Sequence, residues 1–194
     1  MLKNSMRQSK PCMQLNEVQN MRISLSRNAY KSKPAGAQIA VQQREMMAVD
    51  FTHDVEEGLL YFIGQQGHAF RDCILEGGAK TENFVEQNLL TLDFDSGISV
   101  DEFLKQCAEM YICPSVIYHT FSHTDEKPRF RAVFVLDAPV RSVPLAKSLR
   151  RAINYLFPQA DQVKSIVQVW QGSTKGGVFM TDTRLDVGWV KKKW

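Results

Sequence analysis

The chain has 194 residues, of which 44% are hydrophobic, and its 24 Lys and Arg against 21 Asp and Glu leave a net charge of +3. That length is typical of one domain, which can bury a sufficient core without disulfides. The four cysteines form no CxxC pair, the N-terminus has no apolar signal core, and no run approaches the ~20 apolar residues of a membrane span. We therefore expect a cytoplasmic protein without membrane association, and the small net charge neither requires nor excludes a nucleic-acid partner.

The domain organisation follows from where periodic patterns begin and end. Residues 1–20 are polar and lack periodicity, which predicts a flexible N-terminal extension. Residues 21–175 are patterned throughout and predict one folded domain, with an N-terminal α/β subdomain over 21–87 and a second subdomain over 88–175. Residues 176–194 are rich in glycine and lysine and are expected to form a C-terminal tail.

The N-terminal subdomain contains three recognisable patterns. Residues 22–26 alternate between apolar and polar side chains, as a short strand does. Residues 55–65 carry an apolar stripe at helical spacing. Two apolar stretches, 68–75 and the one that starts at Asn83, flank a double-glycine turn and predict a hairpin.

The second subdomain has a more regular pattern, in which strands and helices follow one another in the order βαββαβ. This split βαβ order is typical of ferredoxin-like and RNA-recognition-motif (RRM-like) sheets, so the predicted fold class is α+β. The predicted elements are a strand over 88–95, a helix begun by the capping box Ser99–Glu102, strands over 115–121 and 129–136, a helix capped by Ser142, and a strand over 166–170.

Four charged side chains share one face of the predicted sheet. Helices cover one face of such a sheet, and its first and third strands are neighbours, so Asp93 and Asp95 should lie beside Arg129 and Arg131 on an open face. Carboxylates at i and i+2 are ~7 Å apart, close enough to share Mg²⁺, and arginines hold phosphates well. The alternative is that the two carboxylates only solvate the end of a strand.

Histidine and aromatic side chains mark the hairpin that follows. His119 and His123 are four residues apart, but their segment looks extended, so a zinc site is not predicted. Ser122 and His123 either donate hydrogen bonds to a phosphate or form a polar hairpin tip, and the pattern favours neither. Tyr118 and Trp170 are expected to pack in the core rather than stack on bases.

Three segments resemble the archaeo-eukaryotic primase superfamily, and most closely the primase-polymerase domains of plasmid, phage and integrative-element replication proteins. They are LTLDFDSG at 90–97, the run from YHTFSH to FVLD at 118–137, and FPQAD at 157–161. The likeness covers roughly residues 21–175. It implies an RRM-like palm and a mobile-element DNA replication enzyme that joins nucleoside triphosphates on a single-stranded DNA template with Mg²⁺ or Mn²⁺, with a replicative helicase as a further candidate partner.

The resemblance also assigns residues. Asp93 and Asp95 match the first, metal-binding motif, and Asp161 matches the third carboxylate. Ser122 begins the second, nucleotide-binding motif, whose basic member is either His123 or Arg131. The predicted site therefore has Asp93, Asp95 and Asp161 as catalytic metal ligands, and Ser122, His123, Arg129 and Arg131 as nucleotide contacts.

Two positions depart from the pattern of that superfamily. Where relatives often carry a further acid and an arginine after the third carboxylate, this chain has Ser165 and Gln168. The departure keeps open a catalytically degenerate module that binds nucleic acid or a replication partner. A metal-dependent nuclease that uses the same carboxylates is a third hypothesis.

Overall fold

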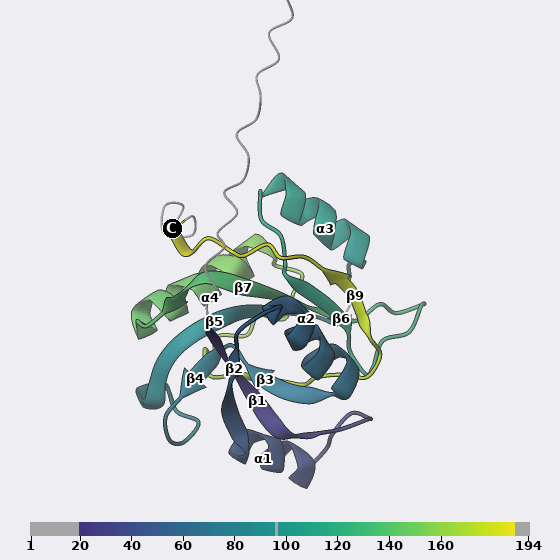
Figure 1. The fold of residues 1–194 in the computed structure, drawn as a ribbon. Helices are drawn as coiled ribbons and strands as arrows, with labels where there is room; N and C mark the ends of the chain where they lie inside the picture. The colour runs from purple at the N-terminus through teal and green to yellow at the C-terminus, as the bar shows by residue number, and fades with distance from the viewer. Residues whose placement is uncertain (1–19, 96, 189–194) are drawn as a thin grey trace, which may run out of the picture.

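The computed structural model describes residues 20–95 and 97–188, so nearly all of the predicted N-terminal extension and the final lysine run lie outside the described residues. The described part is a mixed α+β fold with two antiparallel sheets (Figure 1), and the predicted α+β class is confirmed. Within this part of the chain, no helix combines the length and the apolar character needed to cross a bilayer.

The strands divide between the two sheets according to their order along the chain, with one exception. The four-stranded sheet has the order β2-β1-β3-β8, formed by β1 (Met21–Ala29), β2 (Met46–Phe51), β3 (His68–Arg71) and β8 (Val169–Trp170). The five-stranded sheet has the order β4-β5-β7-β6-β9, formed by β4 (Cys73–Leu75), β5 (Phe84–Phe94), β6 (Val116–His119), β7 (Phe130–Val140) and β9 (Gly177–Met180).

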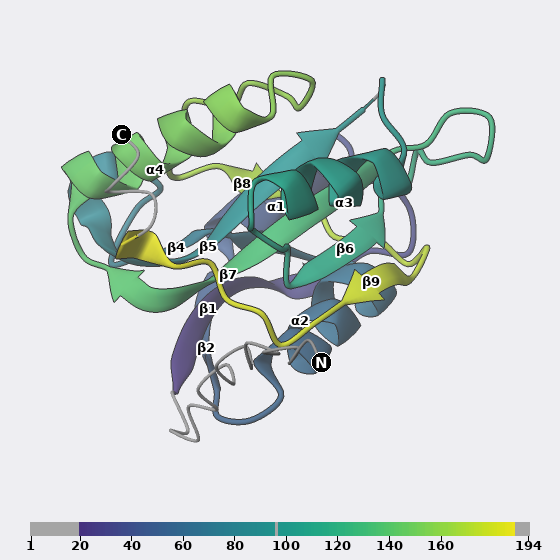
Figure 2. The same cartoon turned by 90° about the horizontal axis from the view of Figure 1, so that it is seen from above.

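The helices lie on both outer sides and at one end of the paired sheets (Figures 1 and 2). Those on the outer sides are α1 (Ala37–Arg44), α3 (Val100–Glu109) and α4 (Val143–Leu156). The predicted helix over 55–65 is α2 (Val55–Leu60) continued by a π-helical turn, η1 (Tyr61–Gln66), and a short 3₁₀ turn, η2 (Thr81–Asn83), precedes β5. Gly67 ends η1 with a φ of 83°, a left-handed conformation that favours glycine.

A first core lies between the five-stranded sheet and the helices α3 and α4. Leu92 and Phe94 from β5 and Phe134 from β7 pack there against Phe103 of α3 and Leu149 of α4. The predicted capping box is present, because the Ser99 hydroxyl accepts a hydrogen bond from Glu102 N at 3.2 Å and the Glu102 carboxylate accepts one from Ser99 N at 2.8 Å.

The opposite face of the five-stranded sheet is not open over its length, which corrects the sequence-based expectation. Leu89 of β5 and Val133 of β7 pack against Ile23 and Leu25 of β1 and Phe70 of β3 in a second core. The apolar side of β1 requires such a partner, because a four-stranded sheet buries its hydrophobic face against another layer. Asp93, on the same face near the end of β5, is 8% exposed.

The βαββαβ order is present, but its last strand belongs to the other sheet. The strands β5, β7 and β6 are adjacent, with the first and third as central neighbours, as predicted. However, β8 pairs with β3, and β4 takes the remaining edge of β5, so the RRM-like topology is not reproduced in full. The strand β9, within the segment expected to be a tail, extends the sheet beside β6.

The predicted apolar strand over 68–75 is divided at Asp72. Its first part, β3, pairs with β1 in the four-stranded sheet, and its second part, β4, pairs with β5 in the five-stranded sheet. The backbone carbonyl of Asp72 accepts hydrogen bonds from Asn88 N at 3.1 Å and Leu89 N at 3.2 Å. Asp72 thus lies at the point where the chain passes from one sheet to the other.

Candidate functional site

Two acidic and two basic side chains face each other where β5 ends and β7 begins. Asp93 is the register partner of Arg131, and Arg131 Nη2 donates a hydrogen bond to Asp93 Oδ2 at 2.6 Å. Directly beyond this end of the two strands, where Asp95 follows β5 and Arg129 precedes β7, Arg129 Nη1 lies 3.7 Å from Asp95 Oδ1. The antiparallel pairing therefore places all four side chains at one end of the sheet, as their spacing predicts.

The third predicted carboxylate comes from the loop after α4. Asp161 N donates a hydrogen bond to the backbone carbonyl of Asp93 at 2.8 Å, which fixes this loop beside the end of β5. Asp93 is 8% exposed, whereas Asp95 and Asp161 are exposed. Burial raises the pKa of the Asp93 carboxyl, Arg131 opposes this shift, and the nearby charges of Asp95 and Asp161 raise the pKa further.

The chemistry of these three residues fits a divalent cation. Asp93 Oδ1 is buried and has no hydrogen-bond partner, so one oxygen of the carboxylate is free to take a ligand. Mg²⁺ prefers hard oxygen ligands and usually binds one or two carboxylates together with waters and substrate phosphates. Asp95 and Asp161 supply further carboxylate oxygens from exposed positions next to it.

A ready three-carboxylate cluster, however, is absent. Over residues 20–95 and 97–188, no three His, Cys, Asp or Glu side chains are grouped so that they could hold a metal ion. The physical reason is that Asp93 and Asp95 are each engaged by the arginine opposite, Arg131 and Arg129. The expectation that these carboxylates converge on a common cation is therefore not met by the described geometry, in which they are turned toward β7.

The predicted nucleotide-contact loop touches the same group of charges. His123 Nδ1 accepts a hydrogen bond from Arg129 N at 3.2 Å, and the side chain of Arg129 in turn faces Asp95. The His123 ring stacks on His119 at 3.5 Å between ring centroids. Burial lowers the pKa of His119, and the nearby charge of His123 lowers it further. Ser122 is half-buried in this loop.

The segment after β8 closes the other side of Arg131. Arg131 Nη1 and the Tyr118 hydroxyl, the latter at 2.8 Å, both donate to the backbone carbonyl of Gln171. The Arg131 guanidinium carbon lies 6.0 Å from the centre of the Trp170 ring. Tyr118 and Trp170 are buried, as predicted, but the role of the Gln171 carbonyl has no signal in the sequence, because any residue type supplies this group.

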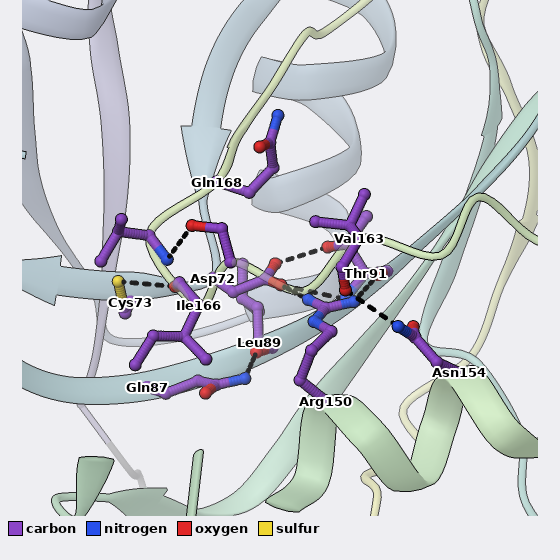
Figure 3. A network of polar contacts seen from close by, with 12 residues as sticks. Asp72, Cys73, Gln87, Leu89, Thr91, Arg150, Asn154, Val163, Ile166 and Gln168 are labelled. Carbon is purple, nitrogen blue, oxygen red and sulfur yellow. Dashed lines mark hydrogen bonds and ion pairs between the residues drawn. The ribbon is translucent and has the colours of Figure 1, made fainter. Parts of the chain in front are cut away.

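A second ion pair, between Asp72 and Arg150, was not predicted (Figure 3). Asp72 Oδ1 accepts a hydrogen bond from Thr91 Oγ1 at 2.6 Å, and Arg150 of α4 donates both to Asp72 Oδ2 and to the Thr91 carbonyl. Burial raises the pKa of the Asp72 carboxyl, and Arg150 opposes that shift. Arg150 also lies 5.5 Å from the centre of the Trp170 ring, so both arginines approach the same indole. One signal was available, since Asp72 is an acid within an apolar stretch.

Known proteins resemble this chain in part of its sequence and in its fold. Residues 66–154 match the VapE N-terminal domain family. The AEP domain of the primase-polymerase of cyanophage S-2L has a similar structure, with a TM-score of 0.50 and 13% sequence identity over 91% of this chain and 89% of that one. The chain has the fold of an archaeo-eukaryotic primase domain. A search of curated proteins found no match.

The resemblance inferred from the three sequence segments is thus confirmed at the level of the fold. Two of those segments, at 90–97 and 118–137, lie within the matched residues 66–154, and the third follows it. The catalytic, metal-binding and nucleotide-binding roles assigned to individual residues stay predictions, as do the domain boundaries.

Proposed function

We propose that this primase-type domain catalyses template-directed nucleotidyl transfer on single-stranded DNA with Mg²⁺ or Mn²⁺. One observation carries the proposal: a buried carboxylate oxygen, Asp93 Oδ1, has no hydrogen-bond partner, and two exposed carboxylates, Asp95 and Asp161, lie beside it. Arginines flank these acids, and this combination of hard oxygen donors and guanidinium groups suits a metal-bound triphosphate.

In this proposal Asp93, Asp95 and Asp161 hold the cation. The metal supplies positive charge that stabilises the phosphoryl oxygens during in-line displacement by a hydroxyl of the primer or the first nucleotide. Binding of a cation by Asp93 and Asp95 would weaken the ion pairs that these acids form with Arg131 and Arg129. Each guanidinium would then be available to contact the triphosphate, whose oxygens match the planar fork of an arginine.

The hairpin loop supplies the remaining nucleotide contacts. His123 already holds the backbone of Arg129, so a phosphate bound by Arg129 lies within the neighbourhood of His123 and Ser122. We infer that β5, β7 and β6, together with α3 and α4, act as the palm. The proposed catalytic domain spans residues 21–175, and β9 extends its sheet beyond that boundary. We also infer a role in replication of a mobile element, whereas nothing in the comparisons supports a helicase partner.

The direct test is primer extension on a single-stranded template with Mn²⁺, comparing the protein with the double variant Asp93→Ala, Asp95→Ala. We expect extension by the unmodified protein and loss of at least about a hundredfold in the variant, the scale expected when electrostatic stabilisation of the transition state is removed. Arg151→Gln, an exposed arginine on α4, is the matched control and should extend normally. Equal, negligible incorporation by the protein and the double variant would contradict the proposal.

The second candidate is a catalytically degenerate binding module. It is favoured by Ser165 and Gln168 and by the engagement of Asp93 and Asp95 with arginines. This candidate predicts DNA binding that survives the double variant and weakens steeply with salt, because it depends on contacts between basic groups and phosphates. The same extension assay also detects the nuclease alternative, since cleavage shortens the labelled strand instead of lengthening it.

A further inference from the structure

A separate pocket of about 510 Å³ lies on the side of the four-stranded sheet that faces away from the five-stranded sheet. Ile23 and Leu25 of β1 point into the core between the sheets, so Ser24 points away from it, and its register partners Ala48 and Arg71 share that outer side. The helix α1 and the turn after β4 form the walls, on the side opposite α3 and α4 (Figure 1).

Arg71 is the notable side chain of this pocket, because it is only 4% exposed and yet has no acidic partner among the described residues. Its Nη2 donates to the backbone carbonyl of Gln43 at 3.3 Å, and its Nε is buried without a hydrogen bond. Burial lowers the pKa of Arg71, which shows that the surroundings oppose its charge. A buried charge without a partner is costly, so a ligand of opposite charge would stabilise this side chain.

The polar part of the remaining lining favours an anion, whereas the rest of the wall is apolar and consists of Ala40, Met46, Met47, Ala48, Ile74, Leu75 and Ala79. Among the residues that the structure describes, no Asp or Glu lines the pocket, whereas Arg44 adds a second guanidinium, and Ser24 and Gln43 add uncharged polar groups. Gly77 and Gly78 form part of the wall, so the backbone there approaches the pocket without a side chain. Arg44 has an ion-pair partner in Glu45 at 3.8 Å, but its side chain is 71% exposed and is therefore held only weakly.

We propose that this pocket binds a phosphate group, with Arg71 at its base and Arg44 at its rim. The planar fork of an arginine matches the oxygens of a phosphate, and such charge-assisted hydrogen bonds would satisfy donors that the protein leaves unpaired. The pocket is larger than a phosphate ion, so the phosphate belongs to a nucleotide or to the end of a nucleic-acid strand. The pocket shares no residue with the acidic site on β5, and the proposal does not depend on catalysis there.

The test uses the full chain in the presence of a chelator, so that metal-dependent binding at the acidic site does not contribute. The first probe is a short single-stranded oligonucleotide that carries either a 5′-phosphate or a 5′-hydroxyl, and its binding is measured by fluorescence anisotropy. The second probe is inorganic phosphate, and its binding is measured by calorimetry. We expect phosphate binding that Arg71→Gln weakens about tenfold or more, the value of one charge-assisted contact. Arg151→Gln should leave it within about twofold.

Arg44→Glu keeps the proposal testable if Arg71→Gln fails to fold, because Arg44 is exposed and reversing its charge should still weaken binding several-fold. A preference for the 5′-phosphate that depends on these arginines identifies a strand end. Equal binding of both strands, with inorganic phosphate bound through the arginines, identifies a free nucleotide or phosphate. Absence of phosphate binding, or binding that neither arginine variant changes, would overturn the proposal.

Discussion

Two pairs of an aspartate and an arginine contact β5 at positions two residues apart, Thr91 and Asp93, and they differ in how completely the carboxylate oxygens are hydrogen-bonded. Thr91 and Asp93 point to the same side of the strand. The first pair, Asp72 and Arg150, contacts β5 at Thr91, and its two side chains are only 3% and 2% exposed. Both carboxylate oxygens of Asp72 accept hydrogen bonds, from Thr91 and from Arg150. The second pair, Asp93 with Arg131, is 11% and 13% exposed and leaves Asp93 Oδ1 without a partner.

The difference shows how one kind of ion pair serves two purposes. The first pair joins the crossing point between the two sheets to α4, and both oxygens of its carboxylate already accept hydrogen bonds, so it stabilises the fold and leaves no carboxylate oxygen for a cation. The second pair holds its carboxylate in place while one oxygen remains available beside two further acids. We expect changes in the first pair to affect stability, and changes in the second to affect ligand binding.

The largest expected effect on stability is that of Arg150→Met. This variant removes the partner of a carboxylate that is entirely buried, and breaking such a pair costs about 3–5 kcal/mol in the free energy of unfolding. Urea denaturation measures the change. Arg151→Met alters the next residue of α4, which is exposed, and should change the free energy of unfolding by less than about 0.5 kcal/mol. Equal stability of the two variants would show that the enclosed pair is not a structural element.

A smaller loss, of about 1–3 kcal/mol, is expected for Arg131→Met. Its carboxylate partner, Asp93, lies at the rim and gains water more easily than Asp72 does, although the bonds of Arg131 to the Gln171 carbonyl are also lost. The same denaturation experiment gives the comparison. If Arg131→Met destabilised the protein more than Arg150→Met, the assignment of the structural role to the enclosed pair would be reversed.

The pH dependence of stability should also separate the two roles. Burial raises the pKa of Asp93 above its ordinary value of 3.8, so the folded protein holds this proton to a higher pH than the unfolded chain does. The protonated Asp93 carboxyl therefore contributes to the free energy of unfolding at pH values below 3.8, and this contribution is lost as the pH rises through the raised pKa. Unfolding measured at several pH values should show the protein losing stability relative to Asp93→Asn on going from pH 3 to pH 7. A difference that does not vary with pH would contradict the raised pKa.

The smallest expected effect on stability is that of Asp95→Asn, within about 0.5 kcal/mol, because the carboxylate is half exposed and its ion pair at 3.7 Å is screened by water. The same variant should nevertheless reduce primer extension by at least about tenfold, as expected for loss of a metal ligand. Thermal denaturation and the extension assay, carried out on one preparation, compare the two effects. Unimpaired extension by this variant would remove Asp95 from the proposed site.

The sequence predicts the acidic site better than it predicts the surroundings of that site. Strand alternation places Asp93 and Arg131 on the same face of neighbouring strands, because both strands are long and their apolar faces are unambiguous, and the structure adds that the two residues are register partners. The same alternation cannot reveal that β1 covers the other face, since the pairing of two sheets depends on contacts between residues far apart in the chain. The sequence also does not reveal which sheet β8 joins, because a strand of two residues carries no pattern that specifies its partner.

The buried arginines show a second limit of sequence reasoning. Arg71 and Arg150 each sit within or beside an apolar stretch, where the usual interpretation is an exposed side chain on the polar face. Whether such a residue is buried, and whether it has a partner, depends on a residue from another element. For Arg150 that residue is Asp72, and for Arg71 no acid is present among the described residues.

The central claim, that the acids at the end of β5 hold a divalent cation, is tested most directly by measuring Mn²⁺ binding with electron paramagnetic resonance. The protein and the variant Asp95→Asn would be titrated under the same conditions, with folding checked by circular dichroism. The account predicts that the protein binds Mn²⁺ and that the folded variant binds it at least about tenfold more weakly. Equal Mn²⁺ binding by both, or none by either, would contradict it.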